Sequence, residues 1–225
     1  MIKLVALIGY PSNSTGEYGK WENSDFSAYK MVHAIKQKSF NGYAEIKSQG
    51  ANYTIRNNAA GHRDALEIVS ANMVHAIKSQ LGLNHASIVP VPGSSYTEIG
   101  QKFTGQRMAD AIQAKFPAFV SRPYVTFNEP VQKAAEGGPR NPNDLTPLMN
   151  LGQEIPDGPV VVIDDVCSTK GHIKAVSRIL RAAGREVSGV VCLAQTVQAK
   201  PEKIFQPTIQ EINIDAWPGD DPGLF

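Results

Sequence analysis

The sequence predicts an α/β protein in which helices flank an open, mainly parallel sheet and a small hood precedes it. Two apolar runs rich in β-branched residues, at 160–163 and 187–195, are typical of strands buried on both faces. Between them, apolar residues fall at helical spacing over 171–183 before Gly184. A second amphipathic helix over 62–81 precedes another short apolar run, 86–89. Strands that alternate with helices in this way predict parallel pairing.

The composition is that of one sizeable globular domain. The chain has 225 residues, 42% hydrophobic and 19% charged, with a formal net charge of +1. This balance gives no reason to expect a nucleic-acid or membrane partner. The two cysteines, Cys167 and Cys192, are too few for a disulfide framework or a paired-cysteine metal site. Residues 1–10 are too short an apolar run for a signal peptide, so they are expected to form a first strand in a cytoplasmic protein.

Taken in order, the chain divides at about residue 61. The first part, 1–61, is expected to form the hood, and 62–225 the α/β core. In the hood we expect a helix through 26–35 and two short strands joined around Gly50. In the core, the remaining expected elements are a helix within 100–115, a strand at 124–127 that continues the sheet, and an edge strand within 204–214.

Two acids stand at the end of the predicted strand 160–163. Asp164 and Asp165 are followed by a turn, 166–172, that leads into the next helix. A helix start exposes unpaired backbone N–H groups and the positive end of the helix dipole, so this turn suits a phosphate. The carboxylates would repel that phosphate, and we expect them to bind ribose hydroxyls or a divalent cation.

A hydrophobic strand ending in aspartate has an alternative interpretation, since Walker-B and receiver-type sites share it. A Walker-type NTPase also needs the pattern GxxxxGK[ST]. The nearest stretch, GEYGKW at 16–21, lacks both the spacing and the hydroxyl. The missing pattern weakens the NTPase interpretation.

A second turn, PVPGSSYTE at 90–98, follows the predicted strand 86–89. Its prolines fix the backbone, while Gly93, Ser94 and Ser95 offer amides and hydroxyls to an anion. The alternative is a connection that proline merely stiffens.

The segment 128–158 is mostly Pro, Gly, Asn and charged residues and shows no periodicity. Such a segment is disordered, a linker or a functional lid, and we favour a flexible lid.

These features resemble the phosphoribosyl diphosphate (PRPP) signature of type I phosphoribosyltransferases. Asp164, Asp165 and Thr169 match the signature, whereas Lys170 replaces a glycine and His172 replaces the last threonine. The turn at 90–98 is similar to the pyrophosphate loop of competence-associated, ComF-like members. Gln132, Arg140 and Asn143 keep the order and spacing of their lid, and the arginine that these members carry before the following helix is not clearly present, Lys102 being the nearest cation. The resemblance covers about residues 86–196.

The resemblance implies a pentosyltransferase of nucleotide metabolism that moves 5-phosphoribosyl from PRPP to an unidentified acceptor, a nucleobase or an amine. Pyrophosphate leaves with the help of Mg²⁺, held by Asp164 and Asp165 directly or through water. Lys133 and Arg140 would arrive with the lid as catalytic cations, and Lys170 would contact the 5-phosphate unless it points into solvent. The implied PRPP-binding residues are Asp164, Asp165, Val166, Cys167, Ser168, Thr169, Lys170, Gly171, His172, Pro92, Gly93, Ser94 and Ser95.

Two other functions fit the same residues. One is a regulatory module that binds PRPP or a nucleotide without catalysis. The other is a metal-dependent phosphohydrolase that uses the acid pair. The acceptor is expected to bind in the hood, which resembles no family, and the sequence leaves open whether the chain forms a homodimer.

Overall fold

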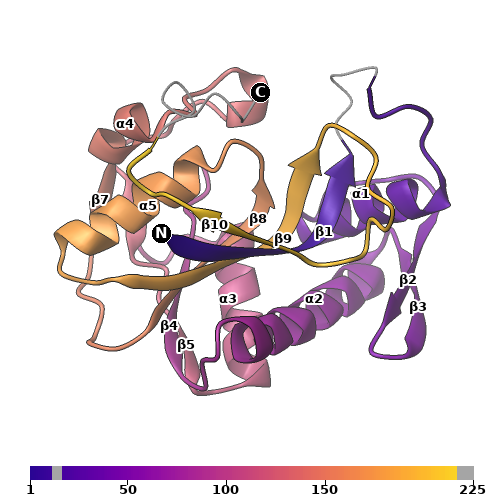
Figure 1. Ribbon diagram of the computed structural model, residues 1–225, viewed down its shortest axis with the longest axis horizontal. Coiled ribbons are helices and arrows are strands. Elements are labelled where there is room, and N and C mark those ends of the chain that lie inside the picture. The colour runs from indigo at the N-terminus through magenta and orange to yellow at the C-terminus, as the bar shows by residue number, and fades with distance from the viewer. Residues whose placement is uncertain (12–16, 217–225) are drawn as a thin grey trace.

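A six-stranded sheet forms the centre of the molecule (Figure 1), in a computed structural model that describes residues 1–11 and 17–216. The strand order is β10-β1-β9-β8-β4-β5, in which β10 pairs antiparallel with β1 and the other neighbours are parallel. The strands are β1 (Ile2–Pro11), β4 (Ala86–Pro90), β5 (Phe119–Ser121), β8 (Val160–Cys167), β9 (Val187–Val197) and β10 (Thr208–Ile212).

Helices cover both faces of this sheet, and each face has its own hydrophobic core. Along β8, Val161 and Ile163 belong to one core, while Val160 and Val162 belong to the other. This alternation explains why the strand is apolar throughout. The first core contains α1 (Asn23–Ile35), α2 (Ala59–Gln80) and α3 (Thr104–Lys115), and the second contains α4 (Pro142–Leu145) and α5 (Gly171–Ala182). The predicted fold class, an open and mainly parallel α/β sheet, is confirmed.

Residues 1–11 were assigned to the hood, yet β1 lies inside the sheet between β9 and β10. Of the segment 1–61, the elements outside the sheet are α1 and the hairpin of β2 (Tyr43–Ser48) with β3 (Ala51–Arg56). The division of the chain into hood and core stays a prediction. The expected edge strand is β10, which pairs antiparallel with β1.

The strand expected at 124–127 is present, but it does not join the main sheet. Val125–Phe127 is β6, which pairs antiparallel with β7 (Met149–Leu151) in a separate two-stranded sheet. The place next to β4 belongs to β5, whose Phe119 is fully buried. Three residues give no periodic signal, and the sequence therefore did not reveal β5.

The segment 128–158 is more regular than its composition suggested. Besides α4 and β7 it contains two 3-10 turns, η1 (Ala134–Glu136) and η2 (Thr146–Leu148). Leu145, Met149 and Ile155 are buried in the core on the α5 side. Exposed residues occur throughout the segment, whereas its buried residues, Gly138 excepted, lie after residue 140. Within residues 1–11 and 17–216, no helix is both long enough and apolar enough to cross a membrane.

The turn of the β2–β3 hairpin yields a test of local stability. Ser48 pairs with Ala51, so the loop is Gln49-Gly50, and both residues have positive φ, 50° and 83°. This is the type I′ pattern, which favours Asn-Gly. We expect Gln49→Asn to raise the free energy of unfolding by about 0.5 kcal/mol because asparagine tolerates the left-handed region better. Urea denaturation measures this.

The matched control at the same turn is Gly50→Ala, which is expected to lower the free energy of unfolding by about 1 kcal/mol. If both variants unfold like the parent, the turn does not have this conformation in solution.

Candidate functional site

Asp164 and Asp165 lie near the end of β8, at the carboxyl edge of the parallel strands. The Oδ1 atom of Asp164 accepts a hydrogen bond of 2.8 Å from the backbone N–H of Asp165. The Asp165 carboxylate faces the helices of the first core, where Lys36 Nζ lies 3.0 Å from Oδ1. The Asp165 carboxylate therefore has a cationic partner from the end of α1.

The electrostatics of this pair are unfavourable for charge on Asp164. Burial raises the pKa of Asp164 well above its usual value, and the neighbouring Asp165 raises it further. Lys36 and the hydrogen bond from Asp165 oppose this shift. The same Asp165 contributes, after burial and Tyr29, to raising the pKa of Tyr10 to about 12. Tyr10 thus also stands close to the acid pair.

The turn after β8 ends at the start of α5. Lys170 is the residue before the helix and has left-handed backbone angles, φ 65° and ψ 2°. The first helical hydrogen bond runs from Lys174 N to Lys170 O (2.9 Å), so the preceding amides, including that of Gly171, have no partner within the helix. Ser168, which is exposed, and Thr169, which is half-buried, precede these amides in the chain. This is the arrangement that binds a phosphate.

The side chain of Lys170 follows neither alternative considered for it. It is buried, and its Nζ donates a 2.7 Å hydrogen bond to Gln210 Oε1 on β10. Gln210 in turn donates to Gln195 Oε1 at 2.7 Å. The expectation that Lys170 either points into solvent or faces the phosphate is replaced by a bond to the edge strand. Val166 and Cys167 also direct their side chains into the two cores, which leaves only their backbone for a ligand.

The predicted pyrophosphate turn lies beside the acid pair. Val91 N donates to Ile163 O (2.9 Å), one residue before Asp164, and Pro92 is buried below the turn. Gly93 and Ser94 are half-exposed, whereas Ser95 is exposed. The start of α3 packs closely against the same turn, because a Cβ on Gly105 would lie 3.1 Å from Val91 O.

The predicted lid contacts the 90–98 turn and acts electrostatically on His172 at the start of α5. Val131 N donates to Ser94 O (2.8 Å), which joins the segment to the 90–98 turn. Arg140 lowers the pKa of His172, in addition to the larger effect of burial, so it stands near the start of α5. The Arg140 guanidinium itself donates to Ala134 O (2.7 Å). Lys133 forms an exposed ion pair with Glu136 (3.1 Å) and is not among the groups that contact the acids.

Three side chains near the acids were not predicted from the sequence. They are Lys36 at the end of α1, Arg107 on α3 and Tyr10 on β1. Burial lowers the pKa of Arg107, and the charge of Asp165 partly offsets this. The Arg107 guanidinium donates to the carbonyl of Ile35 at 2.9 Å. These residues come from three distant parts of the chain and carry no motif, so no signal in the sequence could have found them.

The donor set at this edge fits Mg²⁺ bound together with a substrate. In residues 1–11 and 17–216 there is no group of three or more His, Cys, Asp or Glu side chains that could hold a metal. Two neighbouring carboxylates suffice for Mg²⁺, which keeps several waters and takes its other ligands from phosphates. Asp164 and Asp165 are therefore the residues that could hold the ion.

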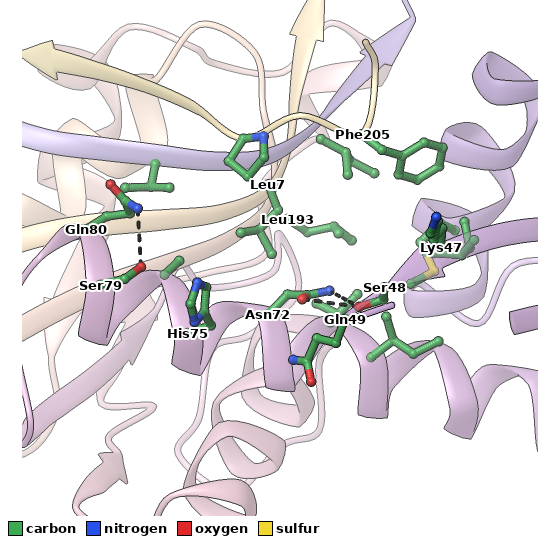
Figure 2. A pocket seen from close by; sticks show the side chains of 18 residues that line it. Leu7, Lys47, Ser48, Gln49, Asn72, His75, Ser79, Gln80, Leu193 and Phe205 are labelled. Atoms are coloured by element: carbon green, nitrogen blue, oxygen red, sulfur yellow. Dashed lines mark hydrogen bonds between the residues drawn. The ribbon is translucent and has the colours of Figure 1, made fainter. Parts of the chain in front are cut away.

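A separate cavity of about 260 Å³ lies on the α2 face of the sheet (Figure 2). Leu7 and Leu193 from the sheet line one side, and α2 lines the other with Asn72 and His75. The tip of the β2–β3 hairpin closes one end, where Ser48 is hydrogen-bonded to Asn72. None of the predicted site residues lines this cavity, so it is not part of the candidate site.

Comparisons with known proteins find similar chains among solved structures. Over 86% of its length the chain is similar to 89% of the adenine phosphoribosyl transferase of Trypanosoma brucei (13% identity, TM-score 0.41), solved with AMP, pyrophosphate and ribose-5-phosphate. It is similar over 73% to 93% of the orotate phosphoribosyltransferase of Aeropyrum pernix (14% identity, TM-score 0.38). It is also similar over 76% to the UMP synthase of Leishmania donovani (16% identity, TM-score 0.39), of which it spans 31%. No family model and no curated protein sequence matches the chain.

Asp164 provides a test of the site electrostatics. Because its pKa is raised in the folded state, the folded protein holds this proton more tightly than the unfolded chain. Ionising Asp164 therefore lowers the free energy of unfolding. This loss is absent below the unfolded-state pKa of about 3.9 and grows as the pH rises to the folded-state pKa. We expect Asp164→Asn to raise the free energy of unfolding at pH 7, with the gain shrinking toward pH 4.

Urea denaturation of parent and variant over pH 4–8 measures this difference. The control is Asp144→Asn, at an exposed position of α4, which should change the free energy of unfolding little. A gain for Asp164→Asn that is the same at every pH would show that proton binding is not its cause.

Proposed function

We propose that this chain is a phosphoribosyltransferase, similar to the ComF-like members, that moves 5-phosphoribosyl from PRPP to a small acceptor. The observation that supports this most is the meeting of three segments at the carboxyl edge of the sheet. The acid pair adjoins the 90–98 turn through Val91 and Ile163, and that turn adjoins the lid through Ser94 and Val131. In open α/β sheets, ligands bind at this edge.

In this reaction the bond between the anomeric carbon and the pyrophosphate oxygen breaks, and a bond to the acceptor nitrogen forms as that nitrogen loses a proton. Positive charge develops on the sugar, so the protein has to position both reactants and exclude water. Asp164 and Asp165 accept hydrogen bonds from the ribose hydroxyls. The same two carboxylates would hold Mg²⁺, which would supply positive charge to offset that of the leaving pyrophosphate.

The phosphates are held at two places. The free amides at the start of α5, with Thr169 and Ser168, take the 5-phosphate, and the 90–98 turn takes the pyrophosphate. Arg140 stands near the start of α5, where it adds charge-assisted contacts when the segment closes. Lys133 joins only after leaving Glu136.

An aromatic hollow on α1 favours a planar nucleobase over ammonia or an aliphatic amine as the acceptor. The hollow has a volume of about 740 Å³, and its walls include Trp21, Phe26 and Tyr29. The Tyr29 ring stacks on that of Tyr10, with centroids 6.1 Å apart, and Tyr10 is the residue near Asp165. Flat aromatic walls bind flat heterocycles by stacking. In this proposal α1 and the β2–β3 hairpin act as the hood.

The direct experiment incubates the pure protein with PRPP, Mg²⁺ and a panel of nucleobases, amines and ammonia. Mass spectrometry then looks for a phosphoribosylated product together with stoichiometric pyrophosphate. Tight PRPP binding without product would favour a regulatory binding module, and release of inorganic phosphate from simple esters would favour a phosphohydrolase.

The proposed function predicts that PRPP binding depends on the acid pair. Asp164→Asn and Asp165→Asn should each weaken binding of PRPP with Mg²⁺ by roughly 1–3 kcal/mol, the scale of hydrogen bonds to charged groups. Isothermal titration calorimetry measures this. Unchanged affinity in both variants would show that PRPP does not bind here.

The proposed function also predicts that PRPP protects the lid from proteolysis. Lys133 and Arg140 are both exposed, and both gain an anionic partner if PRPP binds. We expect PRPP with Mg²⁺ to slow trypsin cleavage after these residues at least several-fold, as followed by mass spectrometry. Cleavage after exposed Lys115, at the end of α3 away from the 90–98 turn, is the internal control and should keep its rate.

A further inference from the structure

Lys36 forms an ion pair with Asp165 inside the candidate site. Its Nζ lies 3.0 Å from Asp165 Oδ1, and the two side chains are only 28% and 21% exposed. Lys36 directly follows α1, whereas Asp165 lies near the end of β8, so the pair joins the hood to the sheet. A pair at this depth is screened less by salt than one at the surface.

The backbone around Lys36 is held in place from α3. The Arg107 guanidinium donates to Ile35 O at 2.9 Å and to Gln37 Oε1 at 3.1 Å, on either side of Lys36. Gln37 has a left-handed φ of 53°, which a residue with a Cβ adopts only at a cost. Strain of this kind persists where surrounding contacts fix it, and it concentrates at functional sites.

The charges around the pair are uneven. Asp164 and Asp165 repel each other, and Lys36 and Arg107 both act on this pair electrostatically. Asp165 also contributes to the raised pKa values of Tyr10 and of the buried Cys192 thiol. The ammonium of Lys36 thus occupies one side of the carboxylate that a divalent cation would use.

We infer that Lys36 is a tethered counter-ion of Asp165, which keeps the acid pair from binding a divalent cation in the free protein. A metal ion beside Asp165 would face the Lys36 ammonium at close range, and like charges repel. PRPP brings enough negative charge for the ammonium and the metal ion to lie side by side. The cation then enters together with its substrate, and this last step rests on the proposed function.

The test measures Mn²⁺ binding to the protein without PRPP, by electron paramagnetic resonance of the free ion. We expect Lys36→Met to bind Mn²⁺ at least tenfold more tightly than the parent. Lys38→Met, which removes an exposed charge two residues further on, should bind like the parent. The double variant Lys36→Met with Asp165→Asn should lose the gain, because the effect acts through that carboxylate.

Equal Mn²⁺ binding by the parent and the Lys36→Met variant, including no detectable binding by either, would overturn the inference. Lys36→Gln serves as a second variant if methionine prevents folding, which circular dichroism would reveal. A parallel titration with PRPP and Mg²⁺ keeps the two proposals apart. If the Mn²⁺ gain occurs but PRPP binds to no variant, the counter-ion role stands and the proposed function fails. If PRPP binds and reacts while Mn²⁺ affinity is unchanged, the function stands and the counter-ion role fails.

Discussion

The structure depends on two carboxylates placed at the end of a strand that is buried on both faces. Asp164 loses hydration and faces the charge of Asp165, and both effects raise its pKa. The neighbouring elements offset this repulsion, since α1 brings Lys36 to within 3.0 Å and α3 holds the end of α1 through Arg107. In the function that we propose, this cost is retained because a sugar and a cation bind at this edge of the sheet. Residues that serve a ligand in this way commonly lower stability.

The turn that follows the acids illustrates how an unusual residue is accommodated. Lys170 has a φ of 65°, a conformation that costs a residue with a Cβ about 1–2 kcal/mol relative to the right-handed region. The glycine of the resembled signature would adopt it freely. Here the lysine side chain gains a hydrogen bond to Gln210, which is bonded to Gln195. The substitution thereby links the phosphate turn to the edge strand β10 without placing an ammonium at the anion site.

In the segment between β6 and β8, the second half is held by contacts with α5, and the first half contains the exposed Lys133 and Arg140. Arg178 on α5 donates to Asn143 Oδ1 at 2.6 Å and also to the carbonyl of Ile214, so one side chain holds both α4 and the residues after β10. Leu145 is fully buried on the same side. Closure over a ligand would therefore involve the first half of the segment, in which Lys133 and Arg140 lie, and leave its second half in place.

The sequence by itself determined the parallel sheet, the acid pair, the helix that starts beside it and the second turn at 90–98. These features depend on local patterns: a run such as Val160–Ile163 is apolar because both faces are buried, and a helix start offers free amides whatever surrounds it. Only the tertiary structure decided that Val125–Phe127 leaves the main sheet, that β1 lies inside it and that Lys170 turns to Gln210. It also decided that Lys36 faces Asp165, across 129 positions of sequence. A contact between such distant residues is set by how the strands and helices pack, and a single sequence carries no local signal of that packing.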